Sequence, residues 1–309
     1  MIDTVKIKKS PFTLFPAVFS FAFAVCLIVF SDVSKTGAAE GLRICRDVIL
    51  TSVFPFSAAA SLLISSGAIG ALGRITGGIV GRAFGVSDAG AGVILLGAVG
   101  GFPTGAYAAS NLYLSGKLSK TEAEKLISYT NNPTPAFMVG YVGSLLGSAV
   151  IGVYCYTCIL VSALLWGVLI RGKYKRSEGN AVVDTEFSFS SSVSKSVFSA
   201  VIICGFVIIF SVISNIVTII GGGLVSSIIC PLFEITSGVG LIFSYGLSLR
   251  MTASLLCAVC SFSGLCIYSQ VKTETDSAGI SVKYYIAGKT FQAVISFILS
   301  FALYPLFFV

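Results

Sequence analysis

Long apolar stretches separated by short polar ones dominate the chain, and their lengths predict helices that cross a membrane. Pro11–Phe30, Val197–Ile220 and Lys283–Val309 each reach the ~20 residues that span a hydrocarbon core of ~30 Å. Ala136–Ile170 is long enough for more than one pass. Backbone amides inside a bilayer must be hydrogen-bonded within their own segment, so these stretches are expected to be helical. The sequence predicts an all-α polytopic membrane protein.

The one long polar stretch, residues 171–195, divides the chain into two halves that resemble each other. A shift of 160 residues gives nine identities over the 31 positions Leu72–Phe102, without a gap. Transporters are often built from inverted repeats that hold their solute between them at mid-membrane. We therefore expect an N-terminal transmembrane helix (1–35), a first repeat (36–170), a cytoplasmic loop (171–195) and a second repeat (196–309).

Both halves contain an interrupted apolar segment at matching positions. Residues 93–114 are broken by Gly100–Gly105, which has three glycines and a proline within six residues. Residues 253–271 are broken around Ser261–Gly264. The arms on either side are too short to span a bilayer, which favours two re-entrant hairpins, one in each repeat. The alternative is a kinked helix that spans the membrane.

A second kind of interruption follows the first hairpin, within residues 119–148. Ser119-x-x-Glu122 is a capping box that opens a helix. The helix must stop before Pro133, since proline disfavours helical geometry at the residue before it. Thr134 and Pro135 then provide an N-cap and first position for another helix. This pattern predicts a helix broken by a polar joint; the alternative is an ordinary loop between two helices.

The breaks supply the candidate ligands for a solute. Half-helices that end inside a membrane leave free N–H groups and a partial positive charge at their N-termini, which suits an anionic or strongly polar group. The side chains at the breaks are small or carry amides, so a solute can approach the backbone closely. They are Gly101, Thr104, Gly105, Thr130, Asn131, Asn132, Thr134, Ser261, Ser263 and Gly264.

Arg74 and Glu234 are ionisable residues in apolar, glycine-rich segments, and the 160-residue shift places one on the other. A charge in such a segment costs several kcal/mol unless it is paired, which makes it a functional hypothesis. The pair would form an interior salt bridge, or Arg74 would receive a substrate carboxylate while Glu234 couples to a cation. In a third interpretation both side chains snorkel to the interface.

Charge and composition narrow the class of protein. The net charge of +7 comes with basic clusters that flank apolar segments, at Lys6–Lys9 and Arg171–Arg176, so both are expected to be cytoplasmic together with the N-terminus. No nucleic-acid surface is expected. With no histidine in the chain and cysteines in apolar surroundings, we expect neither an enzyme nor a metal or other cofactor.

The ordered motifs resemble those of the YlbJ/SpoVV sporulation integral membrane proteins, across roughly Leu50–Ser300. The matching segments are Gly-Phe-Pro-Thr-Gly-Ala, Tyr-Thr-Asn-Asn-Pro, Leu-Phe-Glu-Ile-Thr-Ser-Gly and Ser-Phe-Ser-Gly-Leu-Cys-Ile-Tyr-Ser-Gln. The motifs add Pro103, Thr236 and Gln270 to the candidate site. The resemblance implies a nucleoside-recognition or "Gate" domain, with a fold similar to concentrative nucleoside transporters. The chain departs from the family at Tyr268, where histidine is usual, and at Lys289, where arginine is frequent.

The resemblance implies export of dipicolinic acid from the mother cell to the forespore, in the cell membrane or the outer forespore membrane. The expected partners are a small anionic solute such as dipicolinate and the lipid bilayer, and a homo-oligomer is compatible with the sequence. Two other functions stay open. One is cation-coupled transport of the nucleoside type, and the other is a non-transporting membrane assembly protein of spore formation.

Overall fold

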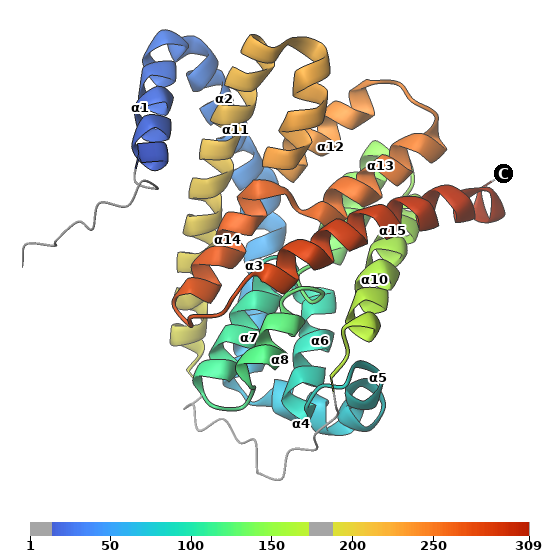
Figure 1. Ribbon diagram of the computed structural model, residues 1–309. Helices are drawn as coiled ribbons and strands as arrows, with labels where there is room; N and C mark the ends of the chain where they lie inside the picture. The colour runs from blue at the N-terminus through green and yellow to red at the C-terminus, as the bar shows by residue number, and fades with distance from the viewer. Residues whose placement is uncertain (1–13, 173–187, 309) are drawn as a thin grey trace, which may run out of the picture.

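The computed structural model describes residues 14–172 and 188–308, and these residues form helices joined by short turns (Figure 1). An all-α polytopic membrane protein is confirmed. The basic residues Lys6–Lys9 and most of the predicted loop 171–195 lie outside the described residues. The elements are α1 (Leu14–Val29), α2 (Ser31–Ile44), η2 (Cys45–Val53), α3 (Phe54–Ser65), α4 (Ala68–Thr76), η3 (Gly77–Gly81), α5 (Arg82–Phe84), α6 (Asp88–Gly100), α7 (Thr104–Leu114), α8 (Lys120–Leu126), η4 (Ala136–Val142), α9 (Gly143–Leu145), α10 (Ala149–Leu169), α11 (Phe189–Phe233), α12 (Ile235–Ser244), α13 (Leu249–Phe262), α14 (Gly264–Asp276) and α15 (Lys283–Phe307).

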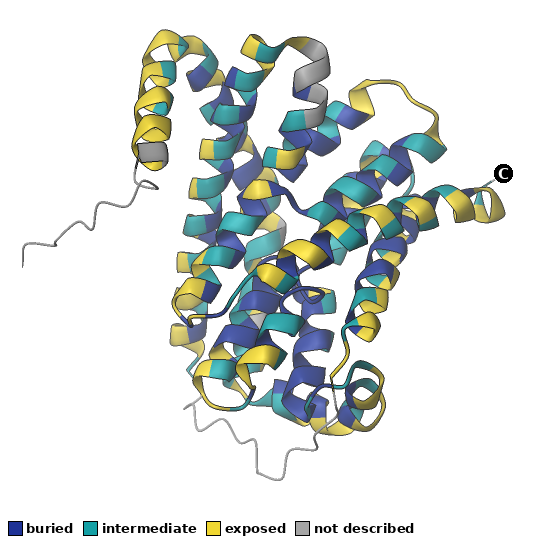
Figure 2. Ribbon diagram, in the orientation of Figure 1, coloured by how far each residue is buried: buried dark blue, intermediate teal, exposed yellow. Residues whose placement is uncertain are grey.

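Within the described residues, four helical stretches are long and apolar enough to cross a membrane singly: 149–169, 189–222, 249–276 and 283–307. Two further pairs of helices pass the same test together but are bent, by 100° after Val29 and by 79° after Ser65. Large apolar side chains such as Phe21, Ile79 and Phe198 are exposed, mainly on the outer helices (Figure 2). This distribution is the one expected where lipid takes the place of water around the protein.

The first apolar stretch, Pro11–Phe30, corresponds to α1, which ends at Val29; Ser31 then begins α2 after a bend of 100°. One other boundary differs from the prediction. The loop predicted to run to Lys195 ends at Ser188, whose side chain accepts a hydrogen bond from Ser191 N at 3.2 Å and so caps the start of α11.

The first interrupted segment forms a hairpin. α6 ends at Gly100, three residues (Gly101–Pro103) lie outside both helices, and α7 begins at Thr104 and packs along α6 (Figure 1). Gly101 has φ 73°, a left-handed conformation that favours glycine at the turn. The placement of this hairpin as a re-entrant loop in a membrane stays a prediction.

The second interrupted segment is not a hairpin, which corrects the prediction for residues 253–271. Ser263 and Gly264 have left-handed φ angles of 77° and 71° at the break between α13 and α14, and these two helices do not pack along each other within 249–276. Residues 249–276 therefore form one broken stretch of spanning length.

The predicted internal repeat corresponds to a similar order of elements. In Leu72–Phe102 a short helix (α4) is followed by a longer one (α6) that ends at a break; in Leu232–Phe262, α12 and α13 repeat this order. The two halves diverge after the break, because α7 turns back while α14 continues. Whether the halves are inverted relative to a membrane stays a prediction.

Candidate functional site

A polar joint between α8 and η4 forms the centre of the candidate site. The Ser119 hydroxyl accepts a hydrogen bond from Glu122 N at 3.2 Å, so the first half of the capping box is present. The Glu122 carboxylate accepts from Ser87 N at 2.6 Å instead of reaching back to Ser119. The helix ends ahead of Asn131–Thr134, and Thr134 Oγ1 accepts from Phe137 N at 3.0 Å to open the next helix.

The hairpin tip packs directly against this joint. A Cβ atom added at Gly101 would lie 2.2 Å from the Thr134 methyl group, and one added at Gly105 would lie 2.5 Å from Thr130 O. Asn131 Oδ1 accepts a hydrogen bond from Ala106 N at 2.9 Å, which satisfies one of the free amides at the start of α7. The predicted residues of the tip and the joint therefore come together, and the contact is as close as glycine allows.

Lys289, on α15, reaches this contact from the other half of the chain. It is fully buried, and its ammonium group donates to Asn131 O, to Asn132 Oδ1 at 3.3 Å and to Gln292 Oε1 at 3.0 Å. Gln292 Nε2 in turn donates to Ser128 O at 2.6 Å. The Phe102 ring lies 5.4 Å from Lys289 Nζ, within cation–π distance. Within residues 14–172 and 188–308, Lys289 has no acidic partner.

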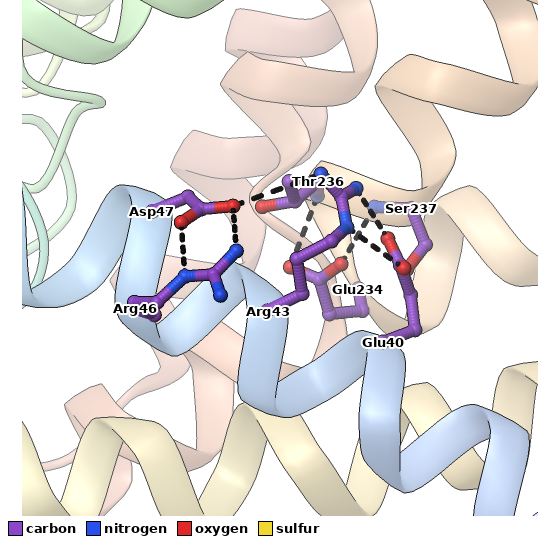
Figure 3. Close-up of polar contacts among 7 residues, drawn as sticks. All are labelled: Glu40, Arg43, Arg46, Asp47, Glu234, Thr236 and Ser237. Atoms are coloured by element: carbon purple, nitrogen blue, oxygen red, sulfur yellow. Dashed lines mark hydrogen bonds and ion pairs between the residues drawn. The ribbon is translucent and has the colours of Figure 1, made fainter.

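Glu234 occupies the start of α12, where it is buried (Figure 3). Its carboxylate accepts hydrogen bonds from Thr236 N at 3.0 Å and Ser237 N at 2.7 Å. A carboxylate in this position satisfies two free amides and interacts favourably with the helix dipole. Glu234 is therefore stabilised by its own helix, and no basic residue in the described part of the chain forms an ion pair with it.

The predicted pairing of Arg74 with Glu234 is wrong. The Arg74 side chain is exposed on α4, and α4 packs against α6, not against α12. The charged side chains near Glu234 belong instead to α2 and η2: Arg43 is bound to Glu40 at 2.6 Å and lies 3.9 Å from Asp47 (Figure 3). Equivalent positions in the two halves do not meet here, because α4 and α12 pack against different helices.

A small cavity of about 50 Å³ lies between the hairpin tip, the joint and the start of α12, and Lys289 does not line it. Phe102 of the hairpin, Thr134 of the joint and Glu234 all line it. Thr236 and Gln270 line it as well, so the cavity brings together predicted residues from both halves. A wider cavity of about 430 Å³ adjoins it, shares Phe137 and Thr236 with it, and contains Arg43 and Asp47.

The remaining predicted residues lie around the second break. Ser261 Oγ donates to Ser296 Oγ on α15 at 2.9 Å, and Ser263 Oγ donates to Ser261 O at 3.2 Å. Gly264 lies against the end of α11, where an added Cβ would be 3.0 Å from Leu232 O. These three residues pack against helices and do not line the cavity beside Glu234.

Lys289 and Gln292 were not among the predicted site residues. Both are buried on one face of α15, and Ser296 and Ser300 continue that face. Spacings of three and four residues place polar side chains on one side of a helix. A polar row of this kind inside an apolar helix is the feature of the sequence that could have identified them.

Helices of spanning length that break around a buried polar centre define a multi-pass integral membrane protein. The chain is 23% identical to the sporulation integral membrane protein YlbJ of Bacillus subtilis (strain 168) over 327 aligned residues, which cover 91% of this chain and 80% of that protein. The resemblance to the YlbJ type of sporulation membrane protein is thereby confirmed. No family model matches the chain. No solved structure matches it either.

Proposed function

We propose that the protein moves a small anionic solute across a membrane of the sporulating cell, and that the solute is dipicolinate, exported from the mother cell to the forespore. The observation that carries the proposal is Lys289. A buried ammonium group without a carboxylate partner marks a place where an anion can bind, since charges inside a membrane protein are rare and usually functional. Dipicolinate itself comes from the family resemblance.

The arrangement around Lys289 suits reversible binding of a planar anion. The ammonium group is held by neutral oxygens of Asn131, Asn132 and Gln292, which a solute carboxylate can replace. The Phe102 ring lies beside Lys289 and also lines the small cavity, so an aromatic face is available for stacking. Replacement of three neutral acceptors by a carboxylate strengthens the hydrogen bonds of the ammonium group.

The described conformation is closed to such a solute. The cavity at Glu234 measures about 50 Å³, whereas ligand pockets occupy roughly 300–1,000 Å³. Binding must therefore move the hairpin tip or α12 away from the joint. We place the protein in the outer forespore membrane with its N-terminus in the cytoplasm, and we assign it no catalytic activity.

Cation-coupled transport of the nucleoside type is a second candidate, and Glu234 favours it. The carboxylate lines the cavity and is buried, so it can exchange a proton or contact a cation together with a neutral solute. A third candidate, a non-transporting assembly protein, is favoured by the tight contact of Gly101 and Gly105 with the joint.

Uptake assays with purified protein in phosphatidylcholine liposomes distinguish the three candidate functions. We expect saturable uptake of labelled dipicolinate above the rate of protein-free vesicles, and no uptake of uridine or benzoate. Uridine uptake driven by a sodium or proton gradient would support the nucleoside-type function instead. Folded protein that carries none of these solutes would support the assembly role. Arg74→Gln is the matched control, because it removes an exposed charge outside the site and should leave the rates unchanged.

A further inference from the structure

A polar chamber lies on the opposite side of the hairpin tip from Glu234. Two cavities form it, of about 370 Å³ and about 30 Å³, and both are lined by Ser61 of α3, Tyr107 of α7 and Lys195 of α11. The wider one opens where α11 begins, at Ser188. The narrower one continues to Pro103 and Thr104 of the hairpin tip. We refer to the residues that line the two cavities as the serine chamber.

Hydroxyl groups dominate the lining of the serine chamber. Nine serines face it, together with Tyr107 and Asn111; the serines are Ser57, Ser61, Ser65, Ser115, Ser188, Ser191, Ser192, Ser196 and Ser199. Several are buried although they are polar, among them Ser61, Ser192 and Ser196. Hydroxyl and amide groups donate hydrogen bonds to an anion and replace part of its hydration.

Lys195 is the one charged residue among those that line the chamber. Its side chain is exposed, and among the described residues no carboxylate lies within ion-pair distance of it. No acidic side chain lines the chamber, so Lys195 favours anions over cations there. Glu274 interacts electrostatically with Tyr107 in the chamber wall and opposes this effect in part.

The hairpin tip separates the serine chamber from the cavity beside Glu234. Pro103 and Thr104 line the chamber, while the neighbouring Phe102 lines the cavity on the other side. Along α11, the chamber extends from Ser188 to Ser199, and Ile203 and Val207 then line the cavity. The polar spaces are thus arranged in sequence along α11, with Phe102 between them.

We propose that the serine chamber is the access route by which a soluble carboxylate anion reaches the hairpin tip, with Lys195 raising its local concentration. This inference rests on the proposed function, and it adds the side of approach and the residue that selects for charge. The simpler interpretation is that the serines and Lys195 only provide a polar end for α11 at the membrane surface.

Thiol labelling tests the chamber without requiring transport. Ser199→Cys and Ser57→Cys place a thiol in the narrow part on two different helices, so either variant can report if the other does not fold. The protein is reconstituted in phosphatidylcholine liposomes, and the wild-type chain gives the background of its nine cysteines. The rates of an anionic and a cationic methanethiosulfonate reagent are then compared.

We expect the anionic reagent to react faster and Lys195→Gln to reduce that preference by roughly two- to tenfold, the effect of one nearby charge in a partly hydrated space. Lys120→Gln is the control, an equal change of charge at an exposed lysine that does not line the chamber. Excess dipicolinate should slow the anionic reagent, and uridine should not.

The proposal is overturned if neither thiol reacts above background, or if Lys195→Gln leaves the preference unchanged. Slowing by phosphatidylglycerol in the vesicles but not by dipicolinate would assign the chamber to lipid headgroups and also overturn it. Solute uptake tests the proposed function separately. If the thiols are labelled as expected but no solute is taken up, only the transport proposal is refuted. If solute is taken up but the chamber does not prefer the anionic reagent, only this inference is refuted.

Discussion

Gly105→Ala tests the contact between the hairpin tip and the joint. Gly105 is the second residue of α7 and has ordinary helical geometry, so the substitution adds a methyl group without straining the backbone. That methyl carbon would lie 2.5 Å from both Thr130 O and Thr130 Oγ1. Neither helix can keep its position, because one of the two oxygens belongs to the backbone.

The expected cost follows from two opposing effects. Excess volume in a well-packed core costs about 1–3 kcal/mol. Alanine is favoured over glycine in a helix interior by up to about 1 kcal/mol, and by less in the first turn. The displaced joint also weakens the bond from Ala106 N to Asn131 Oδ1. We therefore expect Gly105→Ala to lower the free energy of unfolding by about 2 kcal/mol.

Gly240→Ala is the matched control. Gly240 lies within α12, and an added Cβ would meet nothing within 4 Å. The same substitution there should leave stability unchanged or raise it by up to about 1 kcal/mol. The two variants should differ by roughly 2–3 kcal/mol in the free energy of unfolding, combining the packing and propensity effects.

Fluorescence of the single tryptophan, Trp166, provides the assay. Its indole N–H donates to Ser128 Oγ at 2.9 Å, so the probe lies beside the joint. Unfolding in detergent would be followed by heat or by added dodecyl sulfate for wild type and both variants. Equal midpoints for Gly105→Ala and Gly240→Ala would refute the close contact and, with it, the geometry of the site.

Three further substitutions test other contacts by the same unfolding assay. Glu234→Gln leaves one of two amides without its acceptor and should lower the free energy of unfolding by about 1–2 kcal/mol. Arg74→Gln should change it by less than about 0.5 kcal/mol. Equal losses of stability would instead support an ion pair between Arg74 and Glu234. Thr134→Val removes an N-cap and should cost about 1 kcal/mol, whereas Thr157→Val, at an exposed helical threonine, should cost less; the reverse order would contradict the capping assignment. Lys289→Met leaves three buried oxygens without a donor and should destabilise by about 1–3 kcal/mol; an unchanged midpoint would show that these bonds contribute nothing.

Much of the fold could be predicted because apolar length and local breaking residues act over short distances. The predicted helix at residues 283–309 is α15, and the breaks at Gly101 and at Asn131–Thr134 lie where glycine and proline placed them. The direction of the chain after a break could not be predicted in the same way. Gly101–Pro103 reverses the chain and the break at Ser263 and Gly264 does not, although left-handed φ angles occur at both breaks.

The site was predicted in part for a related reason. Thr134 was expected from the broken helix, Glu234 from the internal repeat, and Thr236 and Gln270 from the motifs. All four line one cavity. Arg74 was matched to Glu234 by sequence position alone, which does not determine which face of α4 points inward. Lys289 was noted as a departure from the family pattern but was not assigned to the site, because its role depends on tertiary contacts with a joint more than 150 residues away in the sequence.

Uptake of dipicolinate by liposomes that contain trapped terbium ions, which luminesce when dipicolinate binds them, tests the central claim most directly. Wild-type protein should give a saturable rise in luminescence. Lys289→Met, compared at equal amounts of folded protein, should be at least about tenfold slower, as expected for loss of a charged contact of roughly 1.5–3 kcal/mol. A wild-type rate no greater than that of protein-free vesicles, or equal rates for both proteins, would contradict the account.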